Sequence, residues 1–482
     1  MSYDFDMLVI GGGAAGLTAS GMSAVFGAKT ALIEEKKLGG DCTWNGCVPS
    51  KSLLKAAKVA HHMRTAGRYG LTSVDSEHDL ARVMAHVHSI QERIYEDADA
   101  PPNFEQLGVE LIAGRARFLD PHTVEVGLNG ATRKLSSRYF VVASGSSPRM
   151  PEIDGAQSAT ILNNETIFDL DRLPKSLVVL GAGPIGIEMA QAFRRLGSEV
   201  TVVNHSPGIL QRDDHELTSL LLEHLQGEGI RFLFGTEVVR AKNDAVYTGS
   251  GERLEASAVL AAIGRKPNTG SLNLTAAGVE VNLKGIIVDR RCRSSAKHIY
   301  ACGDIAGRYL FTHFAEHMAK VAVTNAILHL PASLDERHIT WTTFTDPELA
   351  HVGRSEEELK RDGVNYSVYR FPFTQLDRAI MESETAGMVK VFASRWGRIL
   401  GVSILGANAG EMIGEYALAM RNGVGLNKVS STIHPYPAYV LGNRRAADLF
   451  MMAKLTPTMV RCLQWISGLR GDLRGVKSLK QT

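Results

Sequence analysis

The sequence lacks several features that would assign it to a particular class of protein. Its 53 basic and 51 acidic side chains leave a formal net charge of +2, so the charge does not indicate nucleic acid binding. No stretch approaches the roughly eighteen apolar residues of a membrane-spanning helix. Residues 1–6 are acidic and have neither the basic start nor the apolar stretch of a secretory signal peptide. These absences predict a cytoplasmic protein without a transmembrane segment.

Cysteine is also scarce, and two of the five cysteines stand close together. So few cysteines fit a reducing compartment, where a disulfide persists only as part of a catalytic cycle. Cys42 and Cys47 lie in the run GGDCTWNGCVPSK at residues 39–51, where Pro49 suits the first turn of a helix. A helix start and the nearby Lys51 both lower the pKa of a thiol, which favours a redox-active pair.

Other uses of these two cysteines stay open. Buried packing is a common role of an intracellular cysteine. A structural zinc site needs about four ligands, and the three remaining cysteines are neither paired nor near a histidine cluster. These three are Cys292, Cys302 and Cys462. The sequence therefore predicts no metal site.

The N-terminal segment carries a nucleotide-binding turn. Residues 7–10 form a short apolar run typical of a strand, and GGGAAG follows at residues 11–16, before a small-residue helix that reaches about residue 26. Gly11 permits a tight turn, Gly13 permits close approach of a pyrophosphate, and Gly16 permits packing of the helix on the strand. Glu34, after the next predicted strand, is placed to accept hydrogen bonds from a ribose.

The same pattern recurs at residues 177–186, where LVVL precedes GAGPIG. A helix through residue 195 and a strand at residues 200–203 are expected to follow. Two dinucleotide sites in one chain indicate electron transfer between two dinucleotides. Asn204 and His205 follow the second strand, where an acid would favour NAD and an arginine would favour NADP, so the choice between NADH and NADPH is left open.

With two such turns and a Cys-x4-Cys on the first, the chain resembles the flavoprotein disulfide reductases. This family of FAD-dependent pyridine nucleotide-disulfide oxidoreductases includes lipoamide dehydrogenase, glutathione reductase and mercuric reductase. Nearly the whole length takes part in the resemblance. Further matching segments are ASGSSP at 143–148, GRKPNT at 264–269, IYACGD at 299–304, and two C-terminal runs at 344–353 and 404–413.

The resemblance implies an α/β fold with two Rossmann-like dinucleotide-binding domains, for FAD and NAD(P), and a C-terminal α+β dimerisation domain. The expected FAD domain is split between residues 1–155 and 280–345. The NAD(P) domain is expected at 156–279, and the interface domain with a basic tail at 346–482. The family also implies FAD and NADH or NADPH as cofactors, and a homodimer whose active sites are shared between subunits.

The two turns and the resemblance together assign cofactor-binding residues. For FAD these are Gly11, Gly13, Ala14, Ala15, Gly16, Glu34, Gly40, Asp41, Lys51, Ala116, Ser144, Gly145, Asp304 and Thr312. For NAD(P) they are Gly181, Gly183, Pro184, Ile185, Gly186, Asn204, His205 and Gly264.

The resemblance implies a role for each of five catalytic residues. Cys47 is the thiol that faces the flavin, and Cys42 is the outer thiol that attacks an external disulfide. Lys51 and Glu188 match an ion pair beside the reactive flavin nitrogen. His434, in the run TIHPYP, matches the histidine that serves the exchange thiol as acid and base from the partner subunit.

The sequence departs from the family pattern after His434. Members that reduce lipoamide or glutathione carry a glutamate there, where this chain has Tyr439, or Leu441 if the second Tyr-Pro is an insertion. The expectation is an imidazole without an orienting carboxylate, and weak reduction of small disulfides. Asp41, Trp44 and the HPYP run make the chain most similar to the mercuric-reductase-like members.

The sequence therefore predicts an FAD-dependent NAD(P)H oxidoreductase that reduces the Cys42 and Cys47 disulfide and then an unassigned acceptor. One alternative is a mercuric reductase or a diaphorase that acts on quinones or metal ions. Another is a redox-responsive flavoprotein that binds partners and turns over little disulfide. Residues 454–482 hold six basic side chains against one acid, so contact of this tail with an acidic membrane surface is a further hypothesis.

Overall fold

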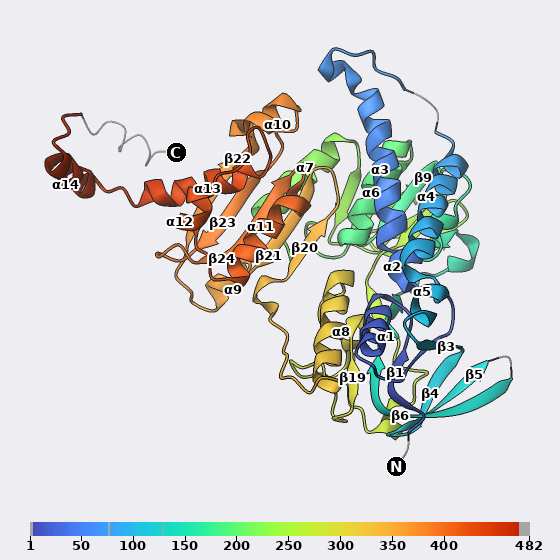
Figure 1. Ribbon diagram of the computed structural model, residues 1–482. Helices are drawn as coiled ribbons and strands as arrows, with labels where there is room; N and C mark the ends of the chain where they lie inside the picture. Colours follow the sequence, from blue (N-terminus) through green and yellow to red (C-terminus); the bar gives the residue numbers. More distant parts are fainter. Residues whose placement is uncertain (1–2, 76–77, 129, 472–482) are drawn as a thin grey trace. The chain divides into compact units, whose positions relative to one another are not determined.

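The computed structural model describes residues 3–75, 78–128 and 130–471 (Figure 1). The chain forms two compact units. The first comprises residues up to 207 together with 229–334, and the second comprises 208–228 together with the residues from 335 onward. The three domain boundaries predicted from the sequence, after residues 155, 279 and 345, stay predictions.

The first unit contains a sheet whose parallel part runs β3, β2, β1, β6 and β19. These strands span Val109–Ala113, Thr30–Glu34, Phe5–Ile10, Ala131–Val142 and Ile299–Ala301. Strand β6 continues into an antiparallel extension with β5 (Thr123–Leu128) and β4 (Arg115–Asp120). In the parallel register Ile10 and Ala301 both pair with Val142. The carboxyl ends of three strands that are far apart in sequence therefore lie side by side.

The turn after β1 requires glycine for steric reasons. Gly11 has φ of +106°, and a Cβ there would lie 2.4 Å from the carbonyl oxygen of Ala143. A Cβ on Gly16 would lie 1.7 Å from the carbonyl oxygen of Gly11. The turn therefore leads directly into α1 (Ala14–Val25), which packs against α8 (Thr312–Ala326).

A second parallel sheet in the same unit repeats this construction with the order β11, β10, β9, β15 and β8. Its strands span Arg231–Phe234, Glu199–Asn204, Ser176–Leu180, Ala258–Ala261 and Ile161–Leu162. Helix α6 (Pro184–Leu196) follows β9, and Gly181, the first residue after the strand, has φ of +100°. The two Rossmann-like parts predicted from the two glycine patterns are confirmed.

Shorter elements complete the first unit. The helices are α2 (Gly40–Trp44), α3 (Cys47–Arg64), α4 (Leu80–Ile94) and α5 (Pro101–Glu105). The strands are β7 (Ser146–Pro148), β16 (Arg265–Pro267), β12 (Val238–Lys242), β13 (Ala245–Thr248), β14 (Arg253–Glu255), β17 (Val281–Asn282) and β18 (Gly285–Ile286). Helix α3 packs against α6, which brings the Cys-x4-Cys motif beside the second nucleotide-binding turn.

The second unit is an antiparallel sheet covered by helices, which agrees with the predicted α+β domain. The strand order is β20 (Thr340–Thr343), β21 (Glu348–Gly353), β24 (Ile399–Gly406), β23 (Met388–Ala393) and β22 (Ser367–Pro372). The helices are α7 (His215–Gly227), α9 (Glu356–Arg361), α10 (Asp377–Met381), α11 (Ala409–Arg421), α12 (Leu426–Ser431), α13 (Leu441–Ala453) and α14 (Pro457–Ser467).

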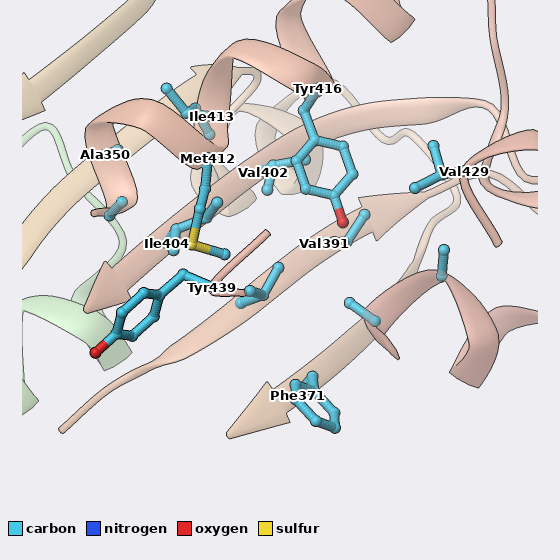
Figure 2. Packing of buried hydrophobic residues seen from close by; sticks show 14 of the residues in the cluster. Ala350, Phe371, Val391, Val402, Ile404, Met412, Ile413, Tyr416, Val429 and Tyr439 are labelled. Carbon is cyan, nitrogen blue, oxygen red and sulfur yellow. The ribbon is translucent and has the colours of Figure 1, made fainter. Parts of the chain in front are cut away.

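The core of the second unit lies between α11 and the sheet. Figure 2 shows Met412 and Tyr416 of α11 directed toward Val402 and Ile404 of β24. Their side chains are buried because one face of the helix carries apolar residues at helical spacing. Within the residues that the structure describes, we find no helix that is both long and apolar enough to cross a membrane.

Candidate functional site

Cys42 and Cys47 lie on two consecutive short elements of the first unit. Cys42 is in α2, and Cys47 is the first residue of α3, directly after Gly46 at the N-cap. Both are free thiols, Cys42 half-buried and Cys47 exposed. The Sγ atom of Cys47 is 3.5 Å from Oγ1 of Thr312, the first residue of α8. The structure therefore brings together the predicted thiols and Thr312, which the sequence separates by 265 positions.

The two thiols have opposite protonation preferences. A hydrogen bond from Cys42, the Thr312 hydroxyl and the Lys51 charge lower the pKa of Cys47 to about 6. The same hydrogen bond, together with burial, raises the pKa of Cys42 well above its usual range. At neutral pH the pair holds its negative charge on Cys47 and its proton on Cys42.

Lys51 and Glu188 form the ion pair that the family resemblance implied. Lys51 lies one turn into α3 and Glu188 lies in the first turns of α6, and Nζ is 2.7 Å from Oε2. The Glu188 side chain is only 4% exposed, so the lysine compensates a carboxylate that water barely reaches. The pair fixes a positive charge one helical turn from Cys47.

The predicted FAD turn has the geometry of a phosphate cradle. Gly13 is the N-cap of α1 and provides no side-chain cap, so the first amides of the helix are left for an external acceptor. Gly40 approaches Gly13 so closely that a Cβ on Gly40 would lie 2.6 Å from the Cα atom of Gly13. Ala14, Ala15 and Gly16 form the first turn of that helix. These residues fit the pyrophosphate of a dinucleotide.

Glu34 stands at the end of β2, where the sequence placed a ribose acceptor. Its Oε2 accepts a hydrogen bond from the backbone amide of Gly12 at 2.6 Å, and its Oε1 accepts one from the backbone amide of Lys36 at 2.7 Å. The carboxylate is thereby fixed at the mouth of the turn. This position suits a ribose that extends from the pyrophosphate.

Asp304 belongs to a charged cluster that sequence reasoning saw only in part. It accepts a hydrogen bond from the Ser146 hydroxyl at 2.5 Å, and Nε of Arg265 is 3.6 Å from its Oδ2. Burial raises the pKa of Asp304 despite these partners. Arg265 also lies 3.3 Å from Asp41, whose other oxygen accepts from Asn164 at 3.0 Å. The guanidinium thus joins two predicted FAD residues.

The remaining predicted FAD residues lie in two different surroundings. Ser144 exchanges hydrogen bonds with Asn268, and Gly145 lies in the same turn with φ of +67°. Ala116 is on β4, where its side chain is buried in the hydrophobic cluster with Phe118. Ser146 and Arg265 were missed as site residues, although both stand in segments quoted for the family resemblance.

The NAD(P) turn repeats the geometry of the FAD turn. Gly183 is the N-cap of α6 without a side-chain cap, Pro184 and Ile185 open the helix, and a Cβ on Gly186 would lie 2.2 Å from the carbonyl oxygen of Gly181. These residues fit a second pyrophosphate.

The residues expected to bind the NAD(P) ribose lie at the end of β10. The Asn204 amide donates to the carbonyl oxygen of Ser206 at 3.1 Å, and His205 Nε2 lies 3.1 Å from the Ser206 hydroxyl. Gly264 adopts φ of +109° immediately before β16. No carboxylate occurs among these residues, so the choice between NADH and NADPH stays open, as it was in the sequence.

His434 lies in the second unit and has a carboxylate partner. Its Nε2 is 2.8 Å from Oε1 of Glu415 on α11, and its Nδ1 is 3.0 Å from the carbonyl oxygen of Thr432. Oε2 of Glu415 accepts a hydrogen bond at 2.8 Å from Asn443 on α13. The expectation that His434 lacks an orienting carboxylate is therefore wrong. Glu415 was missed because it precedes His434 by 19 positions on another helix, where no local pattern marks it.

Tyr439, considered from the sequence in place of a carboxylate, makes a different contact. Its hydroxyl donates to Glu382 at 2.8 Å, and it lines a cavity of about 340 Å³ with Arg378 and Met412. Tyr439 therefore has its own acidic partner, and the hydrogen bonds of the His434 imidazole go to Glu415 and Thr432 instead.

Comparison with known proteins identifies the family. Residues 5–319 match the pyridine nucleotide-disulphide oxidoreductase profile, and residues 339–443 match the dimerisation domain of the same family. A mercuric reductase of Lysinibacillus sphaericus is 35% identical over 93% of this chain and 83% of its own length. A dihydrolipoyl dehydrogenase of Thermus scotoductus is 34% identical over 92% of this chain and 97% of its own. These nearly equal identities do not separate the two activities.

A solved structure agrees with this result. The HOCl-induced flavoprotein disulfide reductase RclA of Escherichia coli superposes with a TM-score of 0.83 at 26% identity, over 93% of this chain and 100% of that one. The glycine turns, the thiol pair and these matches together show that the chain belongs to the pyridine nucleotide-disulphide oxidoreductases, flavoenzymes that use FAD and NAD(P)H.

Proposed function

We propose that this protein is an NAD(P)H-dependent disulfide reductase that passes two electrons to Cys42 and Cys47 and then to a small disulfide. The observation that carries the proposal is the thiol pair at the start of α3, where Cys47 lies 3.5 Å from the Thr312 hydroxyl and has a lowered pKa, while the half-buried Cys42 has a raised pKa. Such a division of roles suits one thiol that stays beside the cofactor and another that leaves to attack a substrate.

FAD, when bound, supplies the relay of an electron pair from NAD(P)H to the sulfur atoms. The residues of the chain prepare the sulfurs for it. Reduction of the Cys42 and Cys47 disulfide by two electrons and one proton breaks the S–S bond, and leaves one thiol and one thiolate. Lys51 stabilises the thiolate on Cys47, and Glu188 holds Lys51 in place through the 2.7 Å ion pair.

The oxidative half of the cycle returns the electrons to the substrate disulfide. Cys42 gives up its proton and attacks one substrate sulfur, which forms a mixed disulfide and releases the first product thiolate. Cys47 then attacks the sulfur of Cys42, restores the internal disulfide and releases the second thiolate. Two protons, one of them from Cys42, complete the two product thiols.

His434 and Glu415 are the proposed acid and base for these proton transfers. The imidazole lies between two hydrogen-bond acceptors, the Glu415 carboxylate at Nε2 and the Thr432 carbonyl at Nδ1. The Thr432 carbonyl is the weaker acceptor because it is uncharged. Nδ1 is therefore the nitrogen that leaves its hydrogen bond and transfers protons to and from a sulfur of the reaction. Because the side chain is 4% exposed, the ring must turn outward to do so.

The proposed enzyme is a homodimer in the cytoplasm. The dimerisation-domain match at residues 339–443 supports this assembly, because it covers both His434 and Glu415. In the dimer these residues serve the thiols of the partner subunit. The carboxylate found beside His434 also removes the reason for considering a flavoprotein that binds partners with little turnover.

A metal ion is the second candidate acceptor. Relatives include mercuric reductases, and RclA of Escherichia coli has been solved as a Cu(II) complex. A vicinal thiol pair with one thiolate suits a soft metal ion. Reduction of a metal ion does not require the proton transfers assigned to His434 and Glu415, so the two candidates differ in their need for these residues.

The test is a steady-state comparison of acceptors with NADH and NADPH as donors. Lipoamide, glutathione disulfide, Hg(II), Cu(II) and a quinone are supplied to the wild type and to Glu415→Gln. We expect the wild type to turn over a disulfide, and this turnover to fall by about 10²-fold in the variant. Turnover confined to metal ions or the quinone, unaffected by the variant, would contradict the proposal.

A further inference from the structure

Helix α14 (Pro457–Ser467) lies outside the buried core of the second unit. The Thr456 hydroxyl caps its start by accepting from the amide of Met459 at 3.1 Å, and Pro457 occupies the first turn. Gly468 ends it in the left-handed conformation. None of its eleven residues is buried. The sequence therefore specifies this helix locally, for a purpose other than the core of the second unit.

One face of α14 is apolar. Met459, Cys462, Leu463 and Ile466 follow the spacing that places residues on a single side of a helix. Met459, Leu463 and Ile466 are 48%, 42% and 70% exposed. Trp465, beside this stripe, is 85% exposed. Four large apolar side chains thus face solvent on three turns of helix, which marks an interaction surface.

The charges around this stripe are of one sign. Lys454, Arg461 and Arg470 are exposed, and no acidic residue occurs between Asp448 and Asp472. Residues 454–482 carry six basic side chains and one acid, whereas the rest of the chain has 47 basic and 50 acidic ones. The excess of positive over negative charge in this sequence therefore lies in residues 454–482, which include this helix.

We propose that α14 docks the enzyme on an anionic lipid surface. The apolar stripe would enter the boundary between headgroups and acyl chains, with Trp465 at that boundary and Arg461 directed to the headgroups. Charge complementarity favours this occupant over a second copy of the chain, because two such segments would bring like charges together. Eleven residues are too few to span a bilayer, so the helix lies in its surface.

The family match supports a separate role for this surface. The dimerisation-domain match ends at residue 443, before α14 begins. A homodimer would carry two such helices, and simultaneous binding of both raises the overall affinity for one surface. Neither the thiol pair nor His434 lies on α14, so docking and disulfide turnover are separately testable.

The test is co-sedimentation of the full-length holoenzyme with vesicles, under reducing conditions so that Cys462 stays free. Vesicles of equal parts phosphatidylglycerol and phosphatidylcholine are compared with phosphatidylcholine alone. We expect binding to the anionic vesicles to be stronger by about tenfold or more, and to weaken with added salt. Binding should also shift the emission of Trp465 to shorter wavelength, and Trp465→Phe should remove that shift.

Variants separate the apolar and basic contributions. Leu463→Asp or Ile466→Asp should abolish vesicle binding, and Arg461→Glu should reduce it severalfold, while disulfide turnover is unchanged. Leu283→Asp is the matched control, because Leu283 is 94% exposed in the turn between β17 and β18. The proposal is overturned by absence of binding, by equal binding to both vesicles, or by Leu463→Asp dissociating a larger assembly in vesicle-free solution.

Discussion

The thiol site and the histidine site of this enzyme are built in different ways. Cys42, Cys47 and Lys51 stand within ten positions of one another, so one short segment carries most of the sulfur chemistry. His434, Glu415 and Asn443 come from a loop and two helices, and hydrogen bonds of 2.8 Å join the three side chains. A contiguous motif can be recognised from spacing. A group assembled from separate elements leaves no such pattern. A carboxylate that is missing just after His434 in the sequence can therefore be supplied by a residue elsewhere, here Glu415.

The largest expected effect comes from breaking the thiol site. Cys42→Ser or Cys47→Ser should lower disulfide turnover by at least about 10³-fold. Without Cys42 no mixed disulfide with the substrate forms, and without Cys47 the mixed disulfide is not resolved. Reduction of a one-electron dye by NAD(P)H should persist. Both rates are measured by NAD(P)H consumption. Cys462→Ser is the control, because Cys462 is an exposed cysteine outside the thiol pair. Retained disulfide turnover in either variant would falsify the sulfur relay.

The next effect tests whether the histidine site needs its carboxylate. Glu415→Gln keeps an oxygen for hydrogen bonding but removes the charge that stabilises an imidazolium, so disulfide turnover should fall by about 10²-fold. The pH dependence of kcat should change, because the imidazole remains but loses the neighbouring charge, and Glu415→Asp should restore part of the wild-type profile.

Glu382→Gln is the matched control for that substitution. Glu382 is a carboxylate of the same unit that accepts a hydrogen bond from Tyr439 rather than from His434. It should leave the pH profile unchanged. If Glu415→Gln lowers activity at every pH by the same factor, Glu415 only supports the fold, and its assignment as a positioning residue fails.

A smaller effect should separate the two nucleotide turns. They share their glycine geometry, but Glu34 ends the strand after the first and Asn204 ends the strand after the second. Asn204→Glu should raise the ratio of kcat/KM for NADH over NADPH about tenfold, because a carboxylate repels the 2′-phosphate. Gln226→Glu adds the same charge on α7 as the control. An unchanged ratio would show that the nicotinamide ribose binds elsewhere.

The smallest effect concerns the charge beside Cys47. In the reduced wild type, the long-wavelength absorption of a thiolate beside the flavin should fade as the pH falls through about 6, the pKa to which Cys47 is lowered. Lys51→Met removes a charge that lowers this pKa, so the midpoint should move upward by about one pH unit. Glu188→Gln should move it downward, because Glu188 raises the pKa.

Lys55→Met supplies the matched control for Lys51. Lys55 lies one turn further along α3 and is exposed, so the midpoint of the wild type should be retained. A shift of equal size in both variants would mean that general charge on α3, rather than the ion pair with Glu188, sets the pKa of Cys47.

The sequence predicted the parts of the site whose chemistry depends on local geometry. The turns at Gly11 and Gly181 could be identified because the backbone there requires glycine. In the structure a Cβ at these two positions would lie only 2.4 and 2.5 Å from a carbonyl oxygen. The Lys51 and Glu188 pair came from the family resemblance. Arg265 could have been inferred from the segment after Gly264, but its position between Asp41 and Asp304 depends on three separate chain segments.

The sequence by itself determined the two Rossmann-like parts, the thiol pair and the basic amphipathic helix, because glycine sterics, thiol spacing and helical periodicity act over a few residues. Only the tertiary structure decided that Glu415 meets His434 and that Thr312 reaches Cys47, over 19 and 265 positions. Such contacts arise from how helices pack on sheets, and packing depends on the whole core rather than on the residues that it brings together.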